Sequence, residues 1–370
     1  MTTTLDESPS TETTRARDVW GLSAHGVRTV AALELRQRVR STRWVVALIV
    51  WVVVIGAITV LISGAIGQLF GTSDSSLSDE HGALLYSAVV FLVLGLGLLV
   101  TPTLSSTSVN GDRAAGTLAT LQVTLLTPAE IAFGKVLASW VAACAFLVAS
   151  TPFLAFAIAT GSTPWVSLLR VVLIVSLLLA SVCAIGLGMS ALVARGAGST
   201  VLTFVVVAAT TFLAPLLFGL TYPAVSHDEQ VQVWSMPASW TGEGDMTCEW
   251  TTQQRSVGHT ERTWWLLAIN PFVITADGAG TPASSSQGAS DGDALGGLRD
   301  VVRQVRSGPT AGLNECWNDP DSFPSQDAVT APVWPWGLAA NLLLGAAGLV
   351  VAIRRLTVPR RTLPRGTRVA

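Results

Sequence analysis

Residues 44–64 read WVVALIVWVVVIGAITVLISG, a run of 21 positions without a charged side chain. A helix rises about 1.5 Å per residue, so about 20 apolar residues cross the ~30 Å hydrocarbon core of a bilayer. The run therefore predicts a membrane-spanning helix. The composition of the whole chain agrees with this, because 50% of its 370 residues are hydrophobic and only 12% are charged.

Five further runs have a similar length and composition. They extend from Ala83 to about Val100, from Val136 to about Thr160, from Val166 to about Val193, from Val201 to Leu220 and from Val333 to Ile353. The fold predicted from these runs is an all-α integral membrane protein with six transmembrane helices. Five of the helices lie in residues 44–220, and the sixth occupies residues 333–353.

The positions of Lys and Arg predict the orientation of these helices. Sixteen of the 22 basic residues lie on one predicted side, and the short loops 65–82 and 161–165 on the other side contain none. Because cytoplasmic loops are enriched in Lys and Arg, both termini are expected to be cytoplasmic. The first 43 residues also lack a secretory signal pattern. The basic residues lie in the tail 1–43, in the loop 101–135, at Arg195 and in the tail 354–370.

Ahead of the first span, Val27, Ala31, Leu35 and Val39 recur every four residues among several Arg residues. This spacing predicts an amphipathic helix that lies on the inner membrane face against anionic lipid. The alternative is a solvated basic segment that only fixes the topology.

The segment 221–332 is expected to be extracytoplasmic and carries 14 acidic residues against five Arg. It contains TWWLLAINPFVITADG at 263–278, whose apolar part is too short to span a bilayer. We therefore predict a re-entrant or interfacial stretch near 264–276. Its characteristic residues are Trp264, Trp265, Asn270, Pro271 and Phe272.

Two further features of this segment are expected. A Gly/Ser-rich linker precedes residues 298–308, where Leu298, Val301, Val302 and Val305 have helical spacing and predict a short surface helix. Cys248 and Cys316 both lie in this segment, where an oxidising compartment would permit a disulfide. Two unpaired thiols are the alternative.

The sequence lacks the residues that several kinds of transport and catalytic chemistry require. The six runs contain no Asp, Glu or His, which disfavours a proton-coupled carrier. Gly134-Lys135 is the only Gly-Lys pair and fails the phosphate-loop pattern at both ends. The four His residues are scattered through polar segments without ligand spacing, so no metal site is predicted. We expect neither an enzyme active site nor a directly bound cofactor.

The cytoplasmic loop between the second and third spans contains NGDRAAGTLATLQVTLLTPAEIAFGK at 110–135, which includes the only lysine of the chain. Its leucines have no lipid to cover them, so we expect a short apolar helix, opened by Gly116 or Thr117, that docks into the groove of a partner. Thr127-Pro128 marks the next turn and the start of the following helix. The alternatives are re-entry into the membrane or a folded lid on the ends of the spans.

This pattern resembles the type-2 ABC exporter permeases. Their comparable stretch runs from an acidic residue and Arg through Gly-Thr, a leucine-rich part and Thr-Pro to Gly-Lys. Here it reads GDRAAGTLATLQVTLLTPAEIAFGK, with Asp112 where Glu is more usual. INPF at 269–272 is similar to the external re-entrant region of these permeases. The resemblance is densest over residues 101–140.

The resemblance implies a membrane domain that pairs with a second copy or a sister permease and with two separate ABC ATPase subunits, which would bind ATP and Mg. The residues that it assigns to ATPase coupling are Asp112, Arg113, Gly116, Thr117, Thr127, Pro128 and Lys135. The exposed leucines of the docking helix, Leu118 and Leu121, complete the predicted coupling set. We therefore expect an exporter permease in a bacterial plasma membrane, without a nucleic-acid partner. The rival hypotheses are a non-transporting scaffold or sensor that binds a partner through its outer segment, and an ion-coupled carrier.

Overall fold

The computed structural model describes residues 20–70, 75–117, 126–161, 163–236, 248–280, 293–309, 312–316 and 331–357. Within these residues, six helical segments are long and apolar enough to cross a membrane, which confirms the six predicted spans. They are α2 (Thr42–Phe70), α3 (Ser75–Ser105), α6 (Pro128–Ala159), α7 (Trp165–Leu192), the continuous run of α8 (Gly196–Ala208), η1 (Ala209–Leu213) and α9 (Ala214–Thr221), and α13 (Trp334–Leu356).

The helices extend further into the predicted loop 101–135 than their apolar runs suggest. Helix α3 continues to Ser105, α4 (Ser108–Ala114) follows after a turn, and α6 already begins at Pro128. In the last turns of α3 the hydroxyl groups of Thr101 and Ser105 donate to backbone carbonyls of the same helix. Apolarity therefore ends before helicity does, and Lys135 lies inside α6 rather than in a loop.

Helices α7 and α13 form the closest pair of the bundle. A Cβ atom added at Gly188 would lie 2.6 Å from the carbonyl oxygen of Gly348, and one added at Gly345 would lie 2.9 Å from the Cα atom of Ser181. Small residues permit such an approach of two backbones within a membrane. The main hydrophobic core is formed mostly by α3, α6 and α7, with smaller contributions from α2, α11 and α13.

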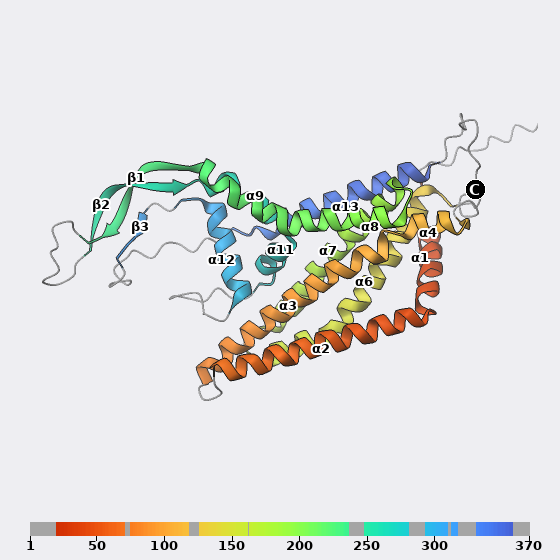
Figure 1. Cartoon of the computed structure of the whole chain (residues 1–370), viewed down its shortest axis with the longest axis horizontal. Coiled ribbons are helices and arrows are strands. Elements are labelled where there is room, and N and C mark those ends of the chain that lie inside the picture. The colour runs from red at the N-terminus through yellow and green to blue at the C-terminus, as the bar shows by residue number, and fades with distance from the viewer. Residues whose placement is uncertain are drawn as a thin grey trace, which may run out of the picture.

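Two of the spans lie at the periphery. In the most apolar window of each span, 56% of residues are buried in α7, against 17% in α2 and 11% in the run from α8 to α9. Helix α2 meets α3 near the loop that joins them and separates from it toward the opposite end (Figure 1). These two peripheral spans therefore expose most of their apolar side chains.

Helix α1 (Ala24–Val39) precedes α2 and begins at the N-cap Ser23. It packs on the start of α6, where a Cβ atom at Gly134 would lie 2.6 Å from Cβ of Val30. Of the predicted apolar stripe, Ala31 is buried and Val39 is exposed. The predicted helix is present, and one of its faces is covered by α6. Its contact with lipid remains a prediction.

The predicted stretch near 264–276 forms two short helices, α10 (Trp265–Ala268) and α11 (Pro271–Gly278). Asn270 lies in the break between them, where its side chain caps α11 by accepting from the amide of Phe272. The ring of Phe272 packs on Phe91 of α3, with 5.7 Å between the ring centroids. Helix α11 thus wedges against the spanning helices. The position of this stretch relative to the bilayer remains a prediction.

The predicted surface helix is present as α12 (Ala294–Ser307), although one side of it is less exposed than expected. Val302 and Arg299 are buried, whereas Val301 is exposed. The guanidinium of Arg303 reaches the buried carboxylate of Asp277 in α11, with 2.6 Å between Nε and Oδ1. Helix α12 therefore packs against α11.

The prediction of an all-α fold is wrong for the segment 221–332, which contains a three-stranded sheet in the order β2-β1-β3. Val231 and Val233 alternate with Gln in β1, so only every second side chain has an apolar surface to cover. The search for helical periods and long apolar runs missed this period of two. The strands are β1 (Ser226–Ser235), β2 (Glu249–Gly258) and β3 (Gly312–Asn314), flanked by the short helices η2 (Tyr222–Val225) and η3 (Thr260–Arg262).

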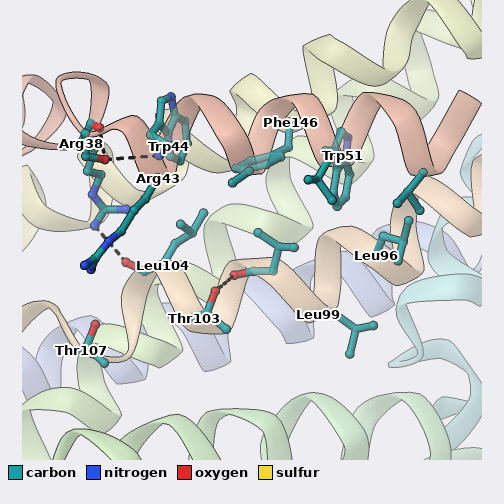
Figure 2. Close-up of a pocket in the computed structure, with 15 residues that line it drawn as sticks. Arg38, Arg43, Trp44, Trp51, Leu96, Leu99, Thr103, Leu104, Thr107 and Phe146 are labelled. Carbon is teal, nitrogen blue, oxygen red and sulfur yellow. Dashed lines mark hydrogen bonds between the residues drawn. The ribbon is translucent and has the colours of Figure 1, made fainter.

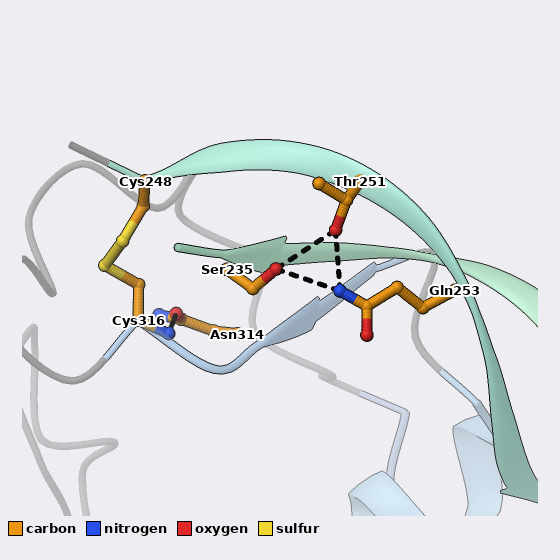
Figure 3. The surroundings of a disulfide bond; sticks show 6 residues. All are labelled: Ser235, Cys248, Thr251, Gln253, Asn314 and Cys316. Atoms are coloured by element: carbon orange, nitrogen blue, oxygen red, sulfur yellow. Dashed lines mark hydrogen bonds between the residues drawn. A yellow bond between two sulfur atoms is a disulfide. The ribbon is translucent and has the colours of Figure 1, made fainter. Parts of the chain in front are cut away.

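The sheet projects beyond the helices at one end of the molecule (Figure 1). Strands β1 and β2 are antiparallel over their whole length, and β3 is parallel to β1 over three residues. A disulfide between Cys248 and Cys316, whose Cα atoms are 6.3 Å apart, ties the beginning of β2 to the residues after β3 (Figure 3). The other two cysteines, Cys144 and Cys183, are free.

Candidate functional site

Helices α1 and α4 lie at the same end of the bundle, as does the last turn of α13 (Figure 1). We call this end the basic end, and the opposite end the sheet end. The basic residues at the basic end include Arg113 at the end of α4, Arg195 at the N-cap of α8, and Arg354 and Arg355 in the last turn of α13.

Lys135 forms a buried joint between three helices at the basic end. It lies in the second turn of α6, and its side chain is 0% exposed. Its ammonium group pairs with Glu34 of α1 and, at 2.5 Å, with Asp112 of α4, and it donates to the carbonyl of Ser108 at 3.2 Å. A buried cation needs such partners because its desolvation is costly. Two predicted coupling residues, Asp112 and Lys135, are thus in direct contact.

Sequence reasoning missed Glu34, although a signal was present. Between residues 20 and 43 it is the only acidic residue, and it lies among five Arg. The only lysine of the chain, placed between apolar residues, required a carboxylate from elsewhere. Only the folding of α1 onto α6 identifies that carboxylate as Glu34.

A second contact between α1 and α6 is centred on Glu130. Its carboxylate accepts from the amide of Thr127 at 2.8 Å and from the amide of Ser23 at 2.9 Å. The hydroxyl of Thr127 donates to the carbonyl of Gly21 at 2.6 Å. Because Thr127 is the N-cap of α6 and Ser23 that of α1, one carboxylate caps two helices. The predicted turn at Thr127-Pro128 therefore also holds α1 in place.

The root of α4 is attached to α7 and α8. The hydroxyl of Ser190 in α7 accepts from the amides of Val109 and Asn110, at 3.1 and 3.2 Å. Ser199 in α8 accepts from the side-chain amide of Asn110 at 3.3 Å and donates to the carbonyl of Ser106. These hydroxyl groups gave no sequence signal, because isolated Ser residues are common in spans. Through its root, α4 contacts α6, α7 and α8.

The tip of α4 is exposed, in contrast to its root. Arg113, Gly116 and Thr117 all face solvent. Gly116 follows the C-cap of α4 with φ of 68°, the left-handed conformation that favours glycine. Leu118 and Leu121, also predicted to couple, lie outside the described residues. We refer to residues 113–117 as the α4 tip.

The predicted external residues lie apart from this joint, at the sheet end. Trp264 lies beneath the guanidinium of Arg306, 4.9 Å from it, and Trp265 is exposed. The side-chain amide of Asn270 donates to the carbonyl of Thr211 in η1 at 2.8 Å. Nearby, one oxygen of Asp277 accepts from the amides of Val333 and Trp334 at the start of α13. These contacts fix the two short helices on the spans.

An open groove lies between α2 and α3 near the basic end (Figure 2). At its charged end, Arg38 donates to the carbonyl of Leu104 at 2.9 Å and to the hydroxyl of Ser139 at 3.2 Å. Burial lowers the pKa of the Arg38 guanidinium below its usual value. As for metals, no group of three or more His, Cys, Asp or Glu that could hold an ion occurs within the described residues.

Comparison with known proteins identifies the family. A family model described as ABC-2 family transporter protein matches residues 28–295. The chain belongs to this family. The match begins in α1, includes every predicted coupling residue and ends at the start of α12. Among curated proteins, none matches the sequence.

Membership of the ABC-2 family makes the chain a type-2 permease, the membrane component of an ABC transporter. With its six long apolar helices, this ABC-2 protein is a multi-pass membrane protein. The Lys135 joint and the α4 tip lie within the part that defines the family.

Proposed function

We propose that the chain is the permease half of an ATP-driven exporter in the plasma membrane. Two copies, or one copy and a sister permease, form the pathway, and separate ATPase subunits bind ATP and Mg. The observation that carries this proposal is the buried Lys135 joint, which links the exposed α4 tip to α1 and α6.

Docking of an ATPase at the α4 tip would act on several helices at once. Pushing α4 displaces Asp112, which is paired with Lys135, and Asn110, which is bonded to Ser199 of α8. A buried ion pair keeps its geometry because separating the two charges in a poorly solvated site is costly. The joint therefore converts movement of the tip into movement of helix ends.

The distribution of charged and aromatic residues supports a cytoplasmic basic end. Arg residues gather at this end, whereas Trp165, Trp265 and Trp336 are exposed at the sheet end, as residues of an aromatic belt are. The Cys248–Cys316 disulfide also fits an oxidising outer compartment. In this orientation the α4 tip lies on the cytoplasmic side of the membrane, where ATP is present.

The peripheral spans provide a surface for the second membrane half. Val53 and Leu61 of α2, and Phe212 and Leu220 in the run from η1 to α9, are more than half exposed. A dimer in which these spans face the partner would place the pathway between the two halves. The two packings of the halves then form the two-state element that ATP binding biases.

Co-purification with a co-expressed ABC ATPase subunit tests the docking claim. We expect Arg113→Glu combined with Thr117→Arg to reduce capture at least tenfold, because both side chains are exposed on the tip, where the ATPase would bind. Arg262→Glu, an exposed charge reversal at the sheet end, is the matched control and should leave capture unchanged. Unchanged capture by the tip variant would contradict the proposal.

The projecting sheet favours a second candidate function, a scaffold or sensor that binds an outer partner. In that case the tip variant would still bind the outer partner, whereas replacing exposed residues of β2 would abolish this binding. ATP hydrolysis by the ATPase subunit, measured with and without the reconstituted chain, distinguishes the two functions. A permease should stimulate this hydrolysis, whereas a scaffold should not.

A further inference from the structure

The groove between α2 and α3 combines an apolar interior with a cationic end. Its volume is about 700 Å³, within the range of roughly 300–1,000 Å³ found for ligand pockets. Trp51 and Phe146 form its inner wall, with 5.1 Å between their ring centroids. Figure 2 shows Arg38 and Arg43 at one end of the groove, and Leu96 and Leu99 toward the other. The groove is therefore amphipathic along its length.

The length of the groove matches the thickness of one bilayer leaflet. Its lining on α2 runs from Arg43 to Val54, and on α3 from Leu96 to Thr107, which follows α3. Each range covers roughly 16 Å at ~1.5 Å per residue. Half of a hydrocarbon core about 30 Å thick is ~15 Å. A molecule that fills the groove from the basic end thus extends about as deep as the acyl chain of one leaflet.

Among the described residues, the cations at the basic end of the groove form no ion pair with a carboxylate, although Glu34, one turn earlier on α1, acts electrostatically on Arg38. Neither Arg38 nor Arg43 forms an ion pair within the described part of the chain. The hydrogen bonds of Arg38 go to a carbonyl and a hydroxyl, which are neutral. Arg43 is exposed beside it, in the first turn of α2. Two guanidinium groups without an ion-pair partner in the described structure, at one end of an apolar groove, form a site for an anion.

We propose that this groove binds an anionic glycerophospholipid from the leaflet at the basic end. One acyl chain lies between α2 and α3 against Trp51 and Phe146, and the phosphate lies between Arg38 and Arg43. The lipid would occupy the space into which α2 separates from α3, so it would support α2, one of the two least buried spans. This inference requires only that the chain spans a membrane, and it holds whether or not the α4 tip binds an ATPase.

The test uses the full chain in lipid nanodiscs with phosphatidylglycerol or phosphatidylcholine that carries a photoreactive diazirine on its acyl chain. We expect the anionic lipid to label peptides from residues 44–54 and 96–107. Arg38→Gln with Arg43→Gln should reduce this labelling roughly tenfold, since each arginine near the surface contributes to anionic lipid binding. The matched control is Arg36→Gln with Arg40→Gln, which removes the same charge from exposed positions that do not line the groove.

A second variant guards against misfolding of the arginine variant. Ala47→Trp fills the groove from α2 and leaves Arg38 and its bonds in place, so it should abolish labelling while the thermal stability is retained. Equal labelling by phosphatidylcholine, loss of labelling in the control, or full labelling of Ala47→Trp would each overturn the proposal. Complete competition by inorganic phosphate would identify a free-anion site instead and would equally overturn it.

Discussion

At the scale of single residues, one lysine joins three helices at the basic end. Lys135 is fully buried and faces two carboxylates from different helices, Glu34 and Asp112. Both carboxylates are about one-fifth exposed, with values of 21% and 22%. The ammonium group is therefore the only member of the triad without access to solvent, and the triad depends on it.

Lys135→Met should lower the free energy of unfolding by about 3–5 kcal/mol, because it leaves two carboxylates facing each other around a buried apolar group. Denaturant unfolding in detergent micelles measures this loss. The triple variant Glu34→Gln, Asp112→Asn, Lys135→Met removes all charges and should recover most of the stability. Equal instability of the single and triple variants would show that packing, and not charge, is responsible.

Gly116→Ala should weaken the end of α4 by about 1–2 kcal/mol, because a residue with a Cβ atom is strained at φ of 68°. Hydrogen exchange of the α4 amides should become roughly 5–30-fold faster. Gly111→Ala is the matched control. Gly111 lies inside α4, where an added Cβ atom meets nothing within 4 Å, so exchange should be unchanged or slower. Faster exchange in both variants would contradict the explanation.

At the scale of elements, apolar length predicted all six spans but not where they end. The last turns of α3 and the first turns of α6 contain polar residues, among them Thr101, Glu130 and Lys135, whose partners come from their own helix, from α1 or from α4. Hydropathy reports which residues prefer a lipid environment, and it does not reveal these hydrogen bonds and ion pairs. The strands were missed for a related reason. Their alternation of apolar and polar residues is short and contains few apolar side chains, so hydropathy does not reveal it.

The candidate site, like the ends of the spans, was predicted only in part. Asp112 and Lys135 were singled out by sequence pattern, and the structure brings them together. Glu34, Ser190 and Ser199 were not, because their roles arise only when α1, α7 and α8 meet α4 and α6. A sequence shows a residue that needs a partner, but it does not show which distant residue supplies it.

The sheet has a pH-dependent contact at His259. Its ring nitrogens lie 3.0 Å from Glu229 and 2.9 Å from Glu261, and the bond to Glu229, followed by that to Glu261, raises the pKa of His259. Stabilisation from a raised pKa is complete below the ordinary histidine value of about 6.5 and is lost as the pH rises through the raised value. At acid pH it is lost again as the pH falls through the lowered pKa of Glu261.

We therefore expect the β1–β2–η3 region to be more stable at pH 6 than at pH 8.5. Proteolysis of the segment between η2 and α10 in the purified protein measures this difference, with protease activity calibrated at each pH. His259→Gln should remove the pH dependence, whereas His25→Gln, an exposed substitution on α1, should preserve it. A pH dependence that persists in His259→Gln would assign the effect to other groups.

At the scale of the whole molecule, the protein has two chemically different ends. The basic end carries the Lys135 joint and the α4 tip, and the sheet end carries the disulfide and exposed Trp residues. The proposed orientation makes a direct prediction about which end a reagent reaches from outside the cell. Lys135 itself is too buried to report this.

In a Cys144→Ala, Cys183→Ala background, a membrane-impermeant maleimide should label Glu229→Cys in intact cells. Arg113→Cys should be labelled only after permeabilisation, because the α4 tip then lies in the cytoplasm. Both positions are accessible in the structure, so the membrane alone decides the result. Labelling of Arg113→Cys in intact cells would invert the topology and remove the proposed contact with an ATPase.

The close packing of α7 against α13 has a consequence for biosynthesis. Gly188 and Gly348 touch through their backbones, yet residues 193–333 are translated between the two helices. At ~5–20 residues per second this takes roughly 7–28 s, during which the glycine face of α7 lacks α13 as its native neighbour. Helix α13 is therefore synthesised only after α7 and the other helices that it packs against. Any delay in the synthesis of the segment that contains the sheet lengthens the time for which this face of α7 lacks its native neighbour.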